Sequence, residues 1–412
     1  PKGGTGLTPL WQYTDFRAYC NLAEVPDATC RADVSPLDVG YVGHGTGDAG
    51  DLLRPGANIM FPKGKTVRIE VQLPKPMPIV QVTVKSRQLK TFRDGCGVRS
   101  IRLWISDERP EGAGTSIADL AITAPLPNAL LPCPIPVRPH IVGRSVTIEF
   151  IPYTPEHKVY LDSISIDGIA PKAKIAESGF QLNALQAADV DGDGRDDLFT
   201  AGTDRALHAI APDGSSLWRY DTNAVVNQMS IIPSEQPTQI VAACEDHTLY
   251  AVTSTGSRTF AVKPPPRTYA RPGYRGVRPF QGRLTVVTNG DLDGNGIPEI
   301  IVGAANWRTY AYDLKGTLLW DDVCWAHTPT CGTTFDLDGD GTREVIMGNS
   351  YTRAVVYSST GKIIGKAGGS SHAGPTAVVC ADLDGNGKGE IVVGDRAGKI
   401  WFQEWHGRRL PT

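Results

Sequence analysis

The sequence predicts an all-β protein in which a β-sandwich is followed by a β-propeller. The 412-residue chain is long enough for two or three domains, and its 45 Gly and 31 Pro favour short strands joined by turns. Before residue 170, apolar residues occupy alternate positions, as in strands with one buried face. After residue 182, a loop-and-strand unit recurs, as it does in propellers.

The first domain is expected over residues 1–170. Period-2 strands separated by Pro- and Gly-rich turns predict a β-sandwich of the jelly-roll type. The alternating apolar residues are Val67, Ile69, Val71, Leu73, Val80, Val82, Val84, Ile101, Leu103, Ile105, Val146, Ile148 and Phe150. The first 60 residues are rich in Gly, Asp and Thr, so we expect an irregular N-terminal arm there.

Four later segments share a nine-residue pattern, with oxygen-bearing side chains at positions 1, 3, 5 and 9 and glycine at positions 4 and 6. Calcium takes about six to eight oxygen ligands, which the side chains and the carbonyl of position 7 of a tight loop can supply. Without a cation these carboxylates would repel one another, so about four structural calcium ions are predicted. The predicted ligand positions are Asp189, Asp191, Asp193, Arg195, Asp197, Asp291, Asp293, Asn295, Ile297, Glu299, Asp336, Asp338, Asp340, Thr342, Glu344, Asp382, Asp384, Asn386, Lys388 and Glu390.

The spacing of these loops predicts the architecture of residues 171–412. The second and third loops begin 45 residues apart, and the first two begin 102 residues apart, which leaves room for one more unit. That unit is visible, but its loop has degenerated to residues 233–237, where no ion is expected. Units of about 40–50 residues with four short strands are propeller blades. Five blades are therefore predicted.

The loops, and the apolar strands that follow them such as Ile300–Gly303, resemble the FG-GAP/VCBS family of calcium-loop β-propellers over residues 182–406. The resemblance implies a fold more than a function, because the family includes adhesion heads, secreted and surface proteins of bacteria and the propellers of some polysaccharide lyases. Five units are fewer than the family usually has, which leaves closure, completion by another chain and truncation open. The strand ending at Gly168 is loosely similar to the end of discoidin or galactose-binding-like domains.

The predicted ligand-binding surface lies on the propeller face opposite the calcium loops. Turns between second and third strands share that face with the loops that join one blade to the next. Arginine forks bind carboxylates and aromatic faces stack on rings, so both suit anionic sugars; ordinary solvated turns or subunit contacts are the alternative. The candidates are Arg267, Tyr269, Arg271, Tyr274, Trp307, Arg308, Tyr351, Arg353 and His372.

The eight cysteines indicate the cellular compartment. Disulfides are predicted between Cys20 and Cys30, Cys96 and Cys133, and Cys324 and Cys331, which favours an oxidising environment. The remaining two, Cys244 and Cys380, lie in apolar strand-like runs and are interpreted as buried thiols. The chain starts at Pro1, so we expect a secreted or cell-surface protein whose signal peptide has been removed, although a trimmed fragment would look the same.

Charge and motifs narrow the function. The net charge of -3 gives no general basis for binding nucleic acid, and no run of 18 apolar residues predicts a membrane span. No catalytic motif is recognisable, which favours a non-enzymatic protein that presents surfaces to glycans, proteins or copies of itself, including assembly into a filament. The alternative is a polysaccharide lyase in which His372 or Tyr351 removes the proton next to a carboxylate and the sandwich is an accessory carbohydrate-binding module. An integrin-like role in binding a partner protein also stays open.

Overall fold

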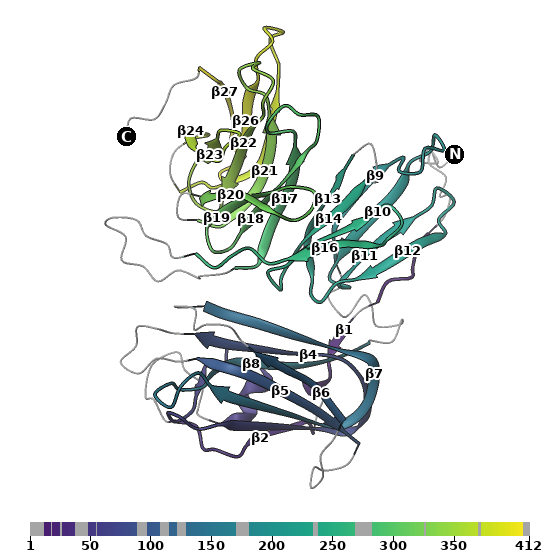
Figure 1. Cartoon of the computed structure of the whole chain (residues 1–412), viewed down its shortest axis with the longest axis vertical. Coiled ribbons are helices and arrows are strands. Elements are labelled where there is room, and N and C mark those ends of the chain that lie inside the picture. The colour runs from purple at the N-terminus through teal and green to yellow at the C-terminus, as the bar shows by residue number, and fades with distance from the viewer. Residues whose placement is uncertain are drawn as a thin grey trace, which may run out of the picture. The chain divides into compact units, whose positions relative to one another are not determined.

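The computed structural model describes residues 12–17, 19–24, 27–37, 48–54, 56–88, 97–107, 115–121, 129–169, 181–233, 238–267, 282–324, 327–369 and 372–406. These residues are almost entirely strands and turns, and none of their helices is long and apolar enough to cross a membrane. They divide into two compact units (Figure 1). Residues 17–169 and 266–267 form one unit, and residues 12–16, 181–265 and 282–406 form the other.

The unit that contains residues 17–169 is a single antiparallel sheet of eight strands, with the order β1-β8-β4-β7-β5-β6, β2 paired with β4, and β3 paired with β8. Two short 3-10 helices, η1 and η2, accompany it. The elements are β1 (Tyr19–Asn21), η1 (Leu22–Glu24), β2 (Thr29–Ala32), η2 (Ala49–Leu53), β3 (Ile59–Met60), β4 (Val67–Gln88), β5 (Val98–Ser106), β6 (Thr115–Ala121), β7 (Ala129–Pro152) and β8 (Tyr160–Ile169).

Two long strands, β4 and β7, fold this sheet over one core. Their pairing shifts register between Gln72 and Met77, where the chain passes through Pro74 and Pro76. The first half of β4 pairs with β2 and the second half with β8, so the strand contributes to both layers around the core. The described strands of this unit form one sheet, in which β4 and β7 run continuously, rather than two separate sheets. The predicted alternation is borne out by burial, and Val67, for example, is 0% exposed.

The predicted disulfide between Cys20 and Cys30 is not formed. Cys20 lies in β1 opposite Gly168, and its thiol donates to the Gly168 carbonyl over 3.7 Å. The other cysteine, Cys30, lies in β2 opposite Val71 and is a free thiol. The two side chains therefore belong to different strand pairs.

The predicted disulfide between Cys324 and Cys331 is also not formed. Both thiols are free, and Cys331 lies on a strand opposite Gly348. Burial raises the pKa of Cys324 to about 12, which keeps its thiol protonated and unreactive. The third predicted pair stays a prediction, because Cys96 lies outside the described residues.

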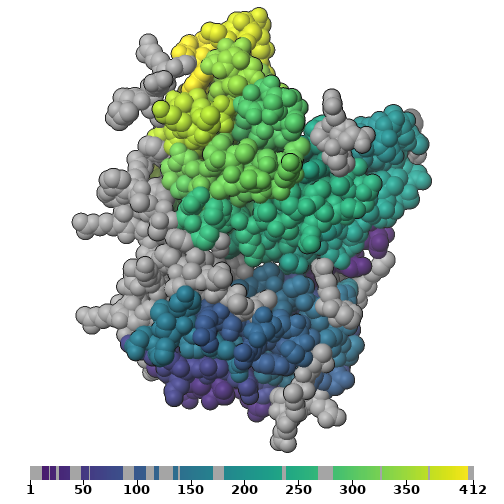
Figure 2. All heavy atoms as spheres, in the orientation of Figure 1, coloured from purple at the N-terminus to yellow at the C-terminus, as the bar shows by residue number. Residues whose placement is uncertain are grey.

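The other unit contains five antiparallel sheets, blades 1 to 5, which follow one another in chain order from teal to yellow (Figures 1 and 2). Blade 1 contains β9 (Leu182–Ala188), β10 (Asp197–Gly202), β11 (Ala206–Ile210) and β12 (Ser216–Asp221). Blade 2 contains β13 (Val226–Ile232), β14 (Gln239–Cys244), β15 (Leu249–Thr253) and β16 (Arg258–Val262). Blade 3 contains β17 (Leu284–Gly290), β18 (Glu299–Ala304), β19 (Arg308–Tyr312) and β20 (Leu318–Val323). Blade 4 contains β21 (Pro329–Phe335), β22 (Glu344–Asn349), β23 (Ala354–Tyr357) and β24 (Ile363–Ala367), and blade 5 contains β25 (Pro375–Ala381), β26 (Glu390–Asp395) and β27 (Ile400–Glu404).

Burial between blades explains the composition of their strands. The first strands of successive blades are in contact, from β9 and β13 to β21 and β25. Each second strand lies between two strands of its own sheet, so β14, β18 and β22 are buried at every residue and are rich in Val, Ile and Ala. Each of the four apolar clusters of this unit draws on two neighbouring blades.

A repeated contact between an aromatic ring and a glycine also joins the blades. The indole of Trp320 on β20 lies against the Gly361 turn of blade 4, and its Nε1 donates to the Ser359 carbonyl over 2.9 Å. A Cβ atom at Gly361 would approach this ring closer than 3.0 Å, which real Cβ atoms essentially never do. Blades 1 and 2 repeat the contact with Trp218 against Gly256.

We expect Gly361→Ala to lower the free energy of unfolding by about 2–4 kcal/mol, because it combines a strained backbone, at φ of +82°, with overpacking against Trp320. The matched control is Gly398→Ala, whose φ is +74° but which has no neighbour within 4 Å. The control should lose only the backbone part, about 1–2 kcal/mol. Urea denaturation of both variants checks this, and equal losses would show that the ring contact contributes nothing.

The outward faces of the end blades carry exposed apolar side chains. In blade 1, Leu185 on β9 is 65% exposed. In blade 5, Ile400 and Phe402 on β27 are 65% and 66% exposed, whereas Trp401 between them packs towards blade 4. Corresponding faces between the other blades are buried, so these two faces differ from the rest of the repeat.

Candidate functional site

The four predicted calcium loops connect the first and second strands of blades 1, 3, 4 and 5. In each loop, three acidic side chains place oxygen atoms within 4.8 Å of one another. The groups are Asp189, Asp191 and Asp193; Asp291, Asp293 and Glu299; Asp336, Asp338 and Glu344; and Asp382, Asp384 and Glu390. Each set offers only oxygen donors, which suits a hard cation such as calcium.

The carboxylate at position 1 organises each loop. In blade 3, Asp291 accepts backbone N–H bonds from Gly294 over 2.9 Å and from Gly296 over 2.8 Å. Asp189, Asp336 and Asp382 make the same pair of bonds. The loop can curl this tightly because the glycines at positions 4 and 6 adopt positive φ, as Gly296 does at 84°.

Glutamate at position 9 completes three of the loops. Glu299 and Glu344 accept a bond from the backbone N–H of position 2, over 2.7 and 3.0 Å respectively. Burial, and then the neighbouring carboxylates of the loop, raise the pKa of Glu344 to about 7. A bound divalent cation would offset this repulsion, so the donor set fits calcium.

The loop of blade 1 differs in its last ligand. Asp197 is buried but does not join the group of clustered oxygens, because aspartate is one methylene shorter than glutamate. In the same loop, Arg195 pairs with Asp193 over 2.9 Å and competes with a cation for that carboxylate. Every loop clusters three of its predicted ligands, but the cluster of this loop lacks the position-9 carboxylate that the other three include. We therefore expect it to bind calcium more weakly.

On the opposite face, the structure brings several predicted ligand-binding residues into one row of rings. Trp307 lies 5.1 Å from His327, His327 lies 4.5 Å from Tyr351, and Tyr351 lies 4.7 Å from His372, between ring centroids. We call these four residues the aromatic row. Trp307 and His327 are half-buried, and the other two rings are exposed.

Backbone bonds hold the loops of the aromatic row together. The Cys324 N–H donates to the Trp307 carbonyl over 2.7 Å, and the His372 N–H donates to the Tyr351 carbonyl over 2.9 Å. The sequence placed these loops on one face, but it did not show that His327 bridges Trp307 and Tyr351. That contact depends on the path between blades 3 and 4, which has no local sequence signal.

The predicted arginines have different environments. Arg308 is half-buried and forms an ion pair with Asp321 over 2.5 Å, so its charge is already neutralised by the fold. Arg353 is exposed, and its Nε donates to the Gly369 carbonyl over 2.6 Å. Arg267 groups with the eight-stranded unit. The remaining candidates, Tyr269, Arg271 and Tyr274, lie outside the described residues.

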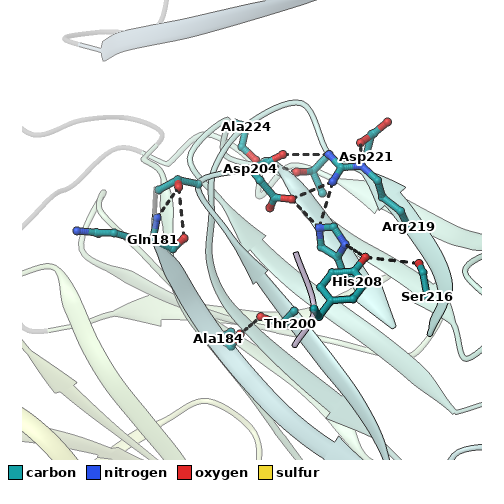
Figure 3. A network of polar contacts seen from close by, with 12 residues as sticks. Gln181, Ala184, Thr200, Asp204, His208, Ser216, Arg219, Asp221 and Ala224 are labelled. Carbon is teal, nitrogen blue, oxygen red and sulfur yellow. Dashed lines mark hydrogen bonds and ion pairs between the residues drawn. The ribbon is translucent and has the colours of Figure 1, made fainter. Parts of the chain in front are cut away.

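Blade 1 also contains a buried polar network that the sequence analysis missed (Figure 3). Asp204 and His208 are both 0% exposed, and the carboxylate lies 2.5 Å from His208 Nε2. Arg219 donates to the same carboxylate over 2.9 Å. The hydroxyl of Tyr13, from the N-terminal arm, lies 3.2 Å from His208 Nδ1, and the Phe16 ring packs 5.1 Å from the imidazole.

A spacing signal could have found this network. Asp246 and Tyr250 in blade 2, and Asn306 and Tyr310 in blade 3, repeat the four-residue spacing of Asp204 and His208 and are hydrogen-bonded over 2.8 and 2.7 Å. The recurrence indicates a structural bond between a turn and the third strand of blades 1, 2 and 3. Blade 1 has a charged form of that bond.

The fold and the loops together define an all-β protein with propeller-type blades and FG-GAP-like repeats. Comparison with protein-family models agrees. A lambda-carrageenase beta-propeller domain matches residues 164–271, and an FG-GAP-like repeat matches residues 336–393.

Two curated relatives share part of this sequence. The lambda-carrageenase of Pseudoalteromonas carrageenovora is 30% identical over 138 residues, which cover 29% of this chain and 15% of the relative. A lambda-carrageenase of another Pseudoalteromonas species is 29% identical over 138 residues, with the same coverage. The matched region is thus a small part of either relative.

Two solved structures are similar to this chain at low TM-scores. A crystal structure of BBS1N in complex with ARL6DN, soaked with lead, is 11% identical, with a TM-score of 0.40, and the alignment covers 86% of this chain and 90% of that one. Chitosan-binding module 1 from a Paenibacillus chitosanase/glucanase is 15% identical, with a TM-score of 0.27, and the alignment covers 36% of this chain and 99% of that one.

Proposed function

We propose that this chain is part of an extracellular, calcium-stabilised protein that acts on an anionic polysaccharide. The observation that carries the proposal is the match of blades 1 and 2 to the lambda-carrageenase propeller domain, with 30% identity to one such enzyme over 138 residues. The comparison favours the polysaccharide-active interpretation over the non-enzymatic one that the sequence suggested first.

The geometry is compatible with this function. The calcium loops and the aromatic row lie at opposite ends of the blade strands, so metal binding can stiffen the blades without occupying the ring surface. Carrageenans are sulfated galactans, and exposed guanidinium groups such as that of Arg353 bind such anions through several N–H donors. Hydrolysis and elimination by a lyase leave different products, so experiment distinguishes the two reaction types.

The test is to incubate the purified chain with lambda-carrageenan in calcium and to follow viscosity, new reducing ends and the ultraviolet absorbance of unsaturated products. Loss of viscosity with new reducing ends alone indicates hydrolysis, and added absorbance indicates a lyase. Binding without cleavage would make this chain the binding part of such an enzyme. Neither binding nor cleavage, with sulfated and neutral galactans alike, would refute the proposal.

A second candidate function, self-association, is favoured by the exposed faces of the end blades. Burying Ile400 and Phe402 of one copy against Leu185 of another would repeat the packing found between the other blades. Mass photometry over a concentration series tests this candidate. Association that Phe402→Ser abolishes would support it, and a monomer at every concentration would exclude it.

A further inference from the structure

We propose that the aromatic row, formed by Trp307, His327, Tyr351 and His372, is a subsite that stacks sugar rings of the polysaccharide. This inference rests on the proposed function and assigns its ligand to one surface. Three consecutive ring contacts of 4.5–5.1 Å make one aromatic strip built from blades 3 and 4 and the loop that leads into blade 5. An aromatic side chain binds ligands with large contact area and little loss of conformational entropy.

The repeat shows that the fold does not require these rings. The turn between second and third strands uses positive φ at Arg205 in blade 1, at His247 in blade 2 and at Trp307 in blade 3. Blade 5 has Gly398 in its corresponding turn, at 74°. Because Arg205 and His247 adopt the same conformation in blades outside the row, this turn accepts several side chains and does not itself require tryptophan.

A glycine in the next loop lets the row assemble. A Cβ atom at Gly374 would clash with the backbone of residues 349–351, so a larger residue would push the loop that carries His372 away from Tyr351. The His372 N–H bond to the Tyr351 carbonyl fixes the same approach. Gly374 is thus a positioning residue for the exposed end of the row.

Two arginines lie on segments that adjoin the exposed end of the aromatic row. Arg353 follows Tyr351 on the same turn, and Arg396 donates its backbone N–H to the Gly374 carbonyl over 3.2 Å. Both side chains are exposed. Their guanidinium groups can donate to sulfate oxygens while the rings stack on the sugar, which predicts a preference for anionic over neutral galactans.

The experiment measures the affinity of the full chain for lambda-carrageenan oligosaccharides by calorimetry in calcium. Tyr351→Ala and Trp307→Ala should each weaken binding about 5- to 10-fold, as expected for loss of one stacked ring. The control is Leu217→Ala, which removes a 49% exposed apolar side chain on β12 of blade 1, outside the aromatic row, and should bind as the unmodified chain does. Arg353→Gln should weaken binding of the sulfated ligand and reduce its salt dependence, with no change for a neutral galactan.

The outcomes separate this inference from the proposed function. If the unmodified chain binds carrageenan and both ring variants bind equally well, the aromatic row is not the subsite and the proposed function stands. If the unmodified chain binds no galactan, the aromatic row is not a subsite and the proposed function is refuted as well. Tyr351 is 38% exposed, so its alanine variant is expected to keep the melting temperature of the parent and to remain informative if Trp307→Ala is unstable.

Discussion

Removal of calcium is expected to lower the melting temperature of the blade unit by about 15 °C or more. Each of the four loops clusters three acidic side chains, and in three of the loops the third is the glutamate of position 9, whereas in blade 1 it is Asp193. A site held at about 100 times its dissociation constant stabilises the folded state by about 2.7 kcal/mol, and each kcal/mol corresponds to about 2–4 °C in a unit of this size. Each site contributes to stability because the folded loop that binds the ion is absent from the unfolded chain.

Thermal unfolding in excess calcium, then in chelator, then after calcium is restored, measures this effect. Two variants serve as a matched pair. Asp336→Asn disrupts a loop whose cluster includes the position-9 glutamate, whereas Asp189→Asn disrupts the loop in which Asp197 does not join the cluster. The calcium-dependent shift should fall more for Asp336→Asn. A melting temperature unaffected by chelator would refute a structural role for calcium in these loops.

The neighbouring loops of blades 3, 4 and 5 also touch. A Cβ atom at Gly294 would lie 2.9 Å from the Gly341 carbonyl oxygen, and one at Gly339 would lie 3.5 Å from that of Gly387. Ions bound in adjacent loops would therefore order backbone that is shared between blades. Melting in chelator is expected to be less cooperative than melting in calcium.

Much of this architecture could be predicted because its determinants are local. The calcium loops are specified within nine residues, by the alternation of acids and by glycines that permit positive φ. Alternation likewise predicted the buried residues Val67, Ile69 and Val71. Their partners across the sheet lie far along the chain, so the continuous path of β4 and β7 through both layers could not be predicted from pattern alone.

The candidate site likewise has features that the local sequence predicts and features that depend on contacts between distant segments. Trp307 and Tyr351 could be assigned to one face from the repeat, but their connection through His327 depends on how two blades pack. Arg308 looked like a ligand-binding cation by type, and its ion pair with Asp321 across the strand pair β19–β20 was not visible in the sequence. Long-range pairings decide which side chains remain available to a ligand.

The buried network of blade 1 leads to the second large effect. Asp204→Ala is expected to lower the free energy of unfolding by about 3–5 kcal/mol, because it removes a fully buried carboxylate that bonds both His208 and Arg219, and leaves Arg219 only its ion pair with Asp221. The matched variant is Asp246→Ala in blade 2, whose carboxylate accepts from the neutral Tyr250 hydroxyl over 2.8 Å. Loss of that bond should cost about 1–3 kcal/mol.

Urea denaturation of the two alanine variants isolates the contribution of charge, since the residues occupy the same position in successive blades. Tyr13→Phe tests the arm separately. It removes only the hydroxyl that lies 3.2 Å from His208 Nδ1, and about 0.5–1.5 kcal/mol should be lost. Equal losses for Asp204→Ala and Asp246→Ala would show that blade 1 gains nothing from its ion pair. A larger loss for Asp204→Ala, together with a measurable loss for Tyr13→Phe, would show that blade 1 is stabilised by the buried charge and by a residue from the N-terminal arm.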